Sequence, residues 1–189
     1  MSARQRLDSI IGERLLRGFP PYGASTRCVC LSECSDDHLK HLVSLRGFSP
    51  WGIVITRSQM MKTGGGSIAY VPPEVYAKFK TFGLEHWAMR TEPGSTWMHE
   101  REWRLPLPGV GVRLASLAAI LIGDPAWRPS LVPTDDWIDP ENGLPCEGPG
   151  ETPFAQQVRA LPALWQESPI WVWNATTKNI DRYKPGELG

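Results

Sequence analysis

The stretch WMHEREWRLP (residues 97–106) decides the fold that we expect for this chain. Side chains alternate between the two faces of a β-strand, so this stretch would place Glu100, Glu102 and Arg104 on one face. Trp103 would lie on the other face, which we expect to pack on a core. The two carboxylates and the guanidinium would then stand in a row, about 7 Å apart, on the opposite face.

Two interpretations of this charged row stay open. Carboxylates held close together usually separate in pKa, which gives one group suited to proton transfer or to hydrogen bonding a hydroxyl. Alternatively, the row is a solvated sheet surface on which Glu102 neutralises Arg104 and Arg101.

The rest of the chain predicts an α+β fold with a mostly antiparallel sheet core interrupted by short helices. Glycine and proline together make up 36 of the 189 residues, which favours turns and short elements. The length suits a single domain spanning residues 1–189. Apolar alternation or continuous apolar runs predict strands, and helical spacing predicts helices. The expected strands are 27–33, 51–56, 67–71, 100–105, 110–114, 118–123 and 169–174, and the expected helices are 7–15, 35–47, 73–90 and 154–165.

The charge is unevenly distributed although the whole chain is formally neutral. Residues 1–123 carry 15 basic and 10 acidic side chains, whereas residues 124–153 carry seven acidic side chains and one arginine. The first segment would attract a phosphate-bearing ligand. The second, rich in turn-forming residues, is predicted to be an irregular acidic loop that is either simply solvated or docks a partner.

Neither a membrane span nor a signal peptide is expected. No apolar run approaches the roughly 20 residues that cross a bilayer, and the apolar residues of the N-terminus are spaced as in an amphipathic helix. We therefore expect a cytoplasmic protein without a membrane partner.

A cysteine-rich segment raises the question of a zinc site. Cys28, Cys30 and Cys34 are followed by His38 and His41. Zinc ligands usually come as C-x2-C pairs across a tight turn, whereas Cys28 and Cys30 alternate within an expected strand. Buried reduced cysteines explain the pattern better, and no metal is expected.

Two motifs together resemble a family of bacterial abortive-infection (phage-resistance) proteins. The first is Cys-Leu-Ser-Glu at 30–33, followed by a short helix and the aromatic, glycine-rich entry to a strand at 47–53. The second is E-x-E-W-R at 100–104, and the glycine-then-strand connection at 64–70 lies between them. The resemblance covers roughly residues 27–123.

The same acidic motif resembles that of mono-ADP-ribosyltransferases, which implies an ADP-ribosyltransferase-like fold with NAD as the substrate. By this resemblance Glu102 is the catalytic carboxylate that binds the nicotinamide ribose and stabilises its oxocarbenium-like transition state, and Glu100 acts on the acceptor. Arg27 would bind the NAD phosphates, with Arg17 as its rival, and Ser32 would lie on the supporting strand.

Further residues complete the expected substrate site. Trp51 and Tyr70 offer aromatic surfaces for stacking. Glu33 closes the Cys-Leu-Ser-Glu motif, and His99 could orient the neighbouring Glu100, although a single histidine before a strand is more often structural.

The function predicted from the sequence is an NAD-consuming, ADP-ribosyltransferase-like enzyme in phage defence or a toxin-like effector. Its partners would be a small-molecule nucleotide and a protein or nucleic-acid acceptor. Hydrolysis of the glycosidic bond of NAD would need the same groups. The alternatives are a non-catalytic protein-interaction module and a protein that acts on nucleic acid through its basic first two-thirds.

Overall fold

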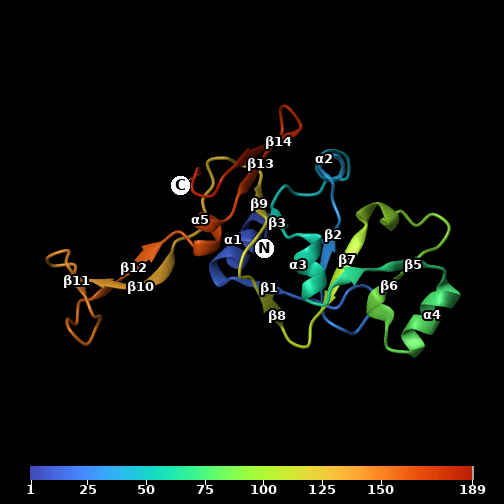
Figure 1. The fold of residues 1–189 in the computed structure, drawn as a ribbon, viewed down its shortest axis with the longest axis horizontal. Coiled ribbons are helices and arrows are strands. Elements are labelled where there is room, and N and C mark those ends of the chain that lie inside the picture. The colour runs from blue at the N-terminus through green and yellow to red at the C-terminus, as the bar shows by residue number, and fades with distance from the viewer. Residues whose placement is uncertain (189) are drawn as a thin grey trace.

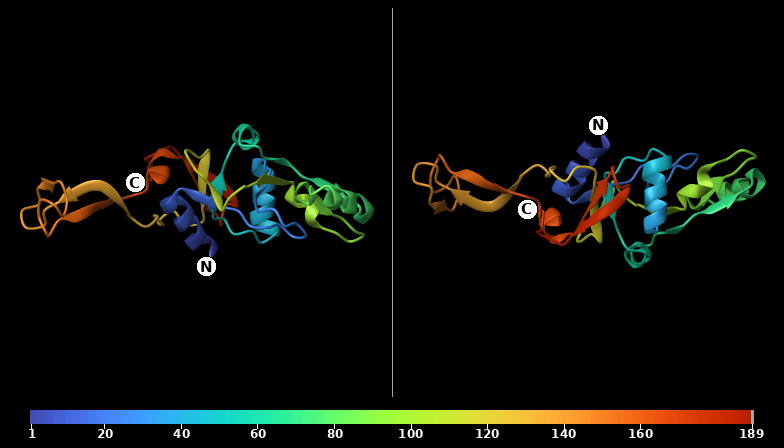
Figure 2. Two further views of the ribbon diagram at one scale, coloured as in Figure 1. Left: turned by 90° about the horizontal axis from the view of Figure 1, so that it is seen from below. Right: turned by 90° about the horizontal axis from the view of Figure 1, so that it is seen from above.

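The computed structural model describes residues 1–188 and has the α+β architecture that the sequence predicts, with mostly antiparallel sheets and few helices. Two sheets lie side by side in the middle of the molecule (Figure 1). A third sheet projects at one end, and a lobe with helix α4 lies at the other (Figures 1 and 2).

The larger central sheet has four strands in the order β14-β13-β9-β3. The strands are β3 (Gly52–Val54), β9 (Ala119–Ile122), β13 (Ile170–Asn174) and β14 (Asn179–Tyr183). Strand β13 runs parallel to β9, and the other neighbours are antiparallel. All four residues of β9 are buried, which explains why its sequence is a continuous apolar run.

Two helices cover this sheet and complete the main core. Helix α1 (Ala3–Glu13) begins with a capping box at Ser2 and contributes Leu7 and Ile11. Helix α5 (Ala163–Glu167) contributes Leu164 and Trp165 to the same cluster. No helix within residues 1–188 is long and apolar enough to cross a membrane.

The smaller central sheet has β7 (Glu102–Pro106) between β2 (Cys28–Ser32) and β4 (Gly66–Ser67), and both pairs are antiparallel. The β2–β7 register places Ser32 opposite Glu102 and Cys28 opposite Pro106. Val29, Met60 and Leu105 form its small core.

Short elements connect and flank these sheets. Strand β1 (Leu15–Arg17) pairs with β8 (Gly111–Arg113), and β5 (Ala69–Val71) pairs in parallel with β6 (Ala88–Arg90). The remaining helical segments are α2 (Asp36–Leu45), α3 (Arg57–Lys62), α4 (Pro73–Thr81), η1 (Glu85–Trp87) and η2 (Trp97–Glu100).

The expected helix over residues 73–90 is only half right. Helix α4 ends at Thr81, where Gly83 adopts a positive φ of 69° that a helix cannot continue. The chain then forms η1 and strand β6. Gly83 is therefore the residue in the sequence that indicates where this helix ends.

The expected irregular loop over 124–153 is interrupted by two strands, and of the expected helix over 154–165 only residues 163–165 are helical, as the start of α5. This part of the chain forms a three-stranded antiparallel sheet of β10 (Val132–Ile138), β11 (Pro145–Cys146) and β12 (Gln156–Ala160). We call residues 132–160 the arm. It projects away from the central sheets in every view (Figures 1 and 2).

Candidate functional site

The expected row of Glu100, Glu102 and Arg104 does not exist as one strand face. Strand β7 begins only at Glu102, because Arg101 adopts a left-handed conformation with φ 47°. Glu100 instead lies in the 3-10 turn η2, outside the strand. The two carboxylates are therefore not held side by side.

Glu102 and Arg104 do share a face of β7, and they form a buried ion pair. Arg104 donates from Nε to one carboxylate oxygen of Glu102 at 2.8 Å and from Nη2 to the other at 3.0 Å. Its Nη1 donates to the carbonyls of His86 and Ala88 at 3.0 and 3.2 Å. The side chain of Arg104 is 0% exposed and that of Glu102 is 9% exposed. Both oxygens of Glu102 are thus occupied by the protein itself.

Cys30 shares this face, opposite Arg104 in the β2–β7 register. Desolvation of its thiol, reinforced by the hydrogen bond and charge of Glu102, raises the pKa of Cys30 to about 12. A thiol with that pKa is protonated at neutral pH, although Cys30 reaches the surface.

We therefore expect Cys30 to react with iodoacetamide at pH 8 roughly 50-fold more slowly than free cysteine, because the scarcity of thiolate outweighs its greater nucleophilicity. Peptide mass spectrometry over a time course measures the rate. Glu102→Gln removes the negative charge beside the thiol and should accelerate alkylation. Labelling of Cys30 in the folded wild type at the rate of free cysteine would contradict the assignment.

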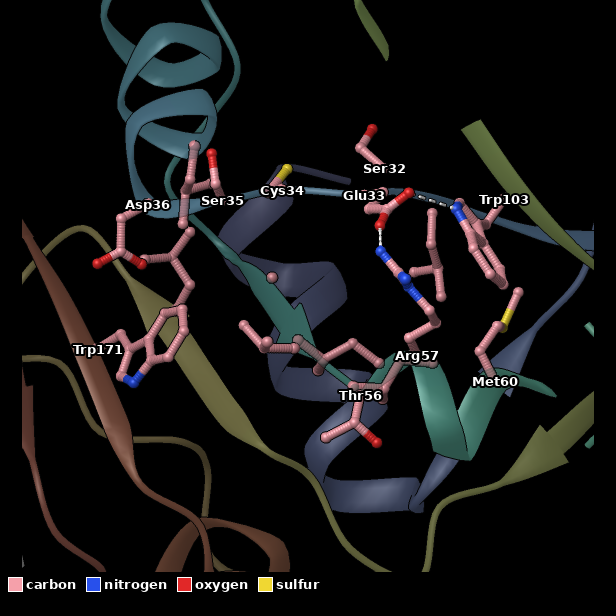
Figure 3. Close-up of a pocket in the computed structure, with 17 residues that line it drawn as sticks. Ser32, Glu33, Cys34, Ser35, Asp36, Thr56, Arg57, Met60, Trp103 and Trp171 are labelled. Carbon is pink, nitrogen blue, oxygen red and sulfur yellow. Dashed lines mark hydrogen bonds and ion pairs between the residues drawn. The ribbon is translucent and has the colours of Figure 1, made fainter. Parts of the chain in front are cut away.

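The other face of β7 contributes to a cavity of about 360 Å³ between the two central sheets (Figure 3). Its lining comes from β2 and the start of α2, from β3 and the start of α3, and from one residue each of β7, β9 and β13. Its lining is mostly apolar, and the indoles of Trp103 and Trp171 lie on two sides (Figure 3). The apolar lining residues include Leu31, Ile53, Ile55, Leu121, Trp103 and Trp171.

Glu33 is the carboxylate at one side of the cavity. It accepts a hydrogen bond from Trp103 Nε1 at 3.1 Å and forms an ion pair with Arg57 (Figure 3). Arg101 lies 3.9 Å from the same carboxylate. The hydrogen bonds from Trp103 and Arg57 lower the pKa of Glu33, and the charges of Arg57 and Arg101 add to the shift. Glu33 is therefore ionised at neutral pH.

A second charged pair lies near the Trp171 side. Arg182 of β14 stacks over the Trp171 ring, with 4.7 Å from its guanidinium carbon to the ring centroid. The same guanidinium donates to Asp36 at 2.7 Å. Arg182 thus links the end of the four-stranded sheet to the first turn of α2.

N-terminal caps hold the starts of helices α2 and α3, next to which the charged side chains of Glu33 and Arg57 lie. The hydroxyl of Ser35 accepts from the backbone N–H of His38, which starts α2 directly after Glu33. Thr56 forms a capping box that starts α3 at Arg57. The cavity is therefore lined by the points at which strands β2 and β3 turn into helices.

Two of the predicted substrate-site residues, Ser32 and Glu33, line the cavity. Tyr70 lies nearby but on the Glu102 side, where its hydroxyl accepts from the backbone N–H of Glu102 at 3.0 Å. His99 lies in η2, and its Nδ1 is 3.4 Å from the guanidinium of Arg46.

Three other predicted residues lie elsewhere. Arg27 precedes β2, at the opposite end of β7 from Glu102, and donates to the carbonyl of Gly18 at 3.2 Å. Its rival Arg17 is ion-paired with Glu13 at 2.6 Å. Trp51 packs edge-on against another tryptophan, 5.2 Å between centroids, beside the main core. The structure does not bring these side chains to Glu102.

The sequence interpretation missed Arg57 and Trp171, which carry much of the cavity's chemistry. The Thr-x-x-Gln capping box at 56–59 was a readable signal that Arg57 opens a helix directly after a strand. Trp171 lies in the expected strand 169–174, but it was not among the predicted site residues. Its contact with Arg182 depends on strand β14, which the sequence analysis did not predict.

Within residues 1–188 there is no group of three or more His, Cys, Asp or Glu side chains placed to hold a metal ion. Among the described residues, the cavity beside Glu33, Trp103 and Trp171 is the candidate site for a ligand. No family model matches the sequence, and the comparisons with curated proteins and with solved structures also gave no match.

Proposed function

We propose that the protein binds a nucleotide of the NAD type in the cavity between its central sheets and consumes it as an ADP-ribosyltransferase-like enzyme. The observation that supports this proposal is the combination of an apolar cavity, two indole walls and a carboxylate flanked by arginines. Planar rings such as nicotinamide or adenine gain stacking energy against indoles. Pockets of a few hundred Å³ suit ligands of this kind.

The charges around the cavity favour a ligand with phosphate groups. The guanidiniums of Arg57, Arg101 and Arg182 face the carboxylates of Glu33 and Asp36, which leaves one net positive charge. Arginine forks match the geometry of phosphate oxygens. A pyrophosphate would bind by sharing these guanidiniums with their present carboxylate partners.

Glu33 takes the role in this proposal that the sequence resemblance gave to Glu102. Cleavage of NAD breaks the bond between C1′ of the ribose and the pyridinium nitrogen, and nicotinamide leaves with the electron pair. A water or acceptor nucleophile then adds to C1′ and loses its proton. An ionised carboxylate beside the ribose stabilises the positive charge that develops at C1′.

The resemblance to abortive-infection proteins supports phage defence as the setting. The same proposal includes the fold: the two central sheets would correspond to the sheets of an ADP-ribosyltransferase-like fold.

Titration with NAD, followed by intrinsic tryptophan fluorescence and checked by calorimetry, tests the binding step. We expect Trp171→Ala to weaken NAD binding roughly 5- to 150-fold, the range that corresponds to the loss of about 1–3 kcal/mol of stacking. Trp137→Ala is the matched control, since Trp137 lies in the arm and away from the cavity lining. Wild-type protein that neither binds NAD nor releases nicotinamide would overturn the proposal.

A further inference from the structure

The arm is a sheet without a core of its own. Its strands pair only with one another, in the order β11-β10-β12. Gly148 is the one buried residue between 132 and 160, and every side chain of the three strands is at least partly exposed. Small sheets gain stability when a face packs against another element. Here the covering is slight: Gly148 lies against the Trp137 ring, and Val132 lies near Gly12 of α1.

The arm and the rest of the chain have net charges of opposite sign. Residues 132–160 carry six carboxylates and the single guanidinium of Arg159, a net charge of −5. Because the whole chain is formally neutral, the remainder carries +5. The positive excess lies in residues 1–65 and 101–123, which hold twelve basic and six acidic side chains.

Apolar side chains accompany the acidic ones on the arm. Leu144 is 61% exposed, next to β11, and Phe154 is 60% exposed, just before β12. These two side chains are apolar surface that a docked partner could cover in addition to the charges.

We propose that the arm of one molecule docks on the body of a second copy of the same chain, where the body is the rest of the chain (residues 1–131 and 161–188) with its net charge of +5. A two-fold arrangement covers both arms at once, since each arm reaches the body of its partner. The charges of arm and body are equal and opposite, which brings the two surfaces together and sets their orientation. This inference is independent of the activity proposed for the cavity.

Sedimentation velocity of the full chain tests the inference at two ionic strengths. We expect a dimer at about 10 mM salt, where charges act over about 30 Å, and dissociation at about 1 M, where they act over about 3 Å. The triple variant Asp135→Asn, Asp136→Asn, Asp139→Asn should be monomeric at both. Circular dichroism verifies that this variant is folded.

The matched control neutralises three exposed carboxylates outside the arm, Asp37→Asn, Glu74→Gln and Glu92→Gln, and should stay dimeric at low salt. A wild-type chain that is monomeric at low salt up to the highest attainable concentration would overturn the inference. So would a dimer that the arm variant forms equally well.

Discussion

Arg104→Ala is expected to lower the free energy of unfolding by about 3–5 kcal/mol, the largest effect of any single substitution considered for this chain. The substitution leaves the carboxylate of Glu102 buried without a counter-charge. It also leaves the carbonyls of His86 and Ala88 without their donor. Urea unfolding followed by tryptophan fluorescence measures the loss.

Two comparisons establish that the uncompensated charge causes this loss. Arg57→Ala removes a guanidinium that is 66% exposed and should cost less than about 1 kcal/mol. Arg104→Met combined with Glu102→Leu removes both charges and should recover part of the stability, although the two carbonyls stay unpaired. If Arg104→Ala unfolds at the same urea concentration as Arg57→Ala, the buried pair does not stabilise the fold as described.

Glu33→Gln is expected to lower the rate of nicotinamide release from NAD about 10²- to 10³-fold while NAD affinity changes little. The amide has nearly the same shape but no charge to stabilise the developing cation at C1′. Product chromatography measures release, and calorimetry measures binding. Glu102→Gln is the control: at a temperature where it is folded, it should keep its activity, because Glu102 does not line the cavity.

The pH dependence of the reaction gives a separate measurement. The lowered pKa of Glu33 keeps its carboxylate ionised below the pH at which an ordinary glutamate is half protonated. Activity should therefore persist to a pH below about 4.3 before it declines, provided that the protein is folded there. An acid limb centred above that value would assign the reaction to another group.

The sequence predicted the strands around the cavity because their signals are local. The continuous apolar run of β9 and the alternation in β2 and β7 each require only a few neighbouring residues. The arm was missed because its strands bury almost nothing and so carry no apolar alternation. Its acidic, turn-rich sequence is compatible with a loop, and only the pairing of distant segments makes it a sheet.

The candidate site shows a different reason for failure. Alternation correctly placed Glu102 and Arg104 on one face of β7 and Trp103 on the other. The sequence predicted that the Trp103 face would pack on a core, and Trp103 and Leu105 do pack with Val29 and Met60. It did not predict that the charged face would be covered as well. The structure buries the charged face and opens part of the Trp103 face to the cavity, because the charges of Arg104 and Glu102 satisfy each other. A charged pair can be buried only when its two groups are placed to hydrogen-bond each other. The order of residues along a strand does not reveal that placement.

Three consecutive codons of strand β7 should therefore give two different phenotypes in living cells. Changes at the outer two, Glu102 and Arg104, would destabilise the folded chain and reduce the amount of protein that escapes proteolysis. Changes at the middle one, Trp103, would alter the cavity and leave more of the protein present but impaired. Measuring abundance and function side by side in one variant library would separate a defect of folding from a defect of activity at single-residue spacing.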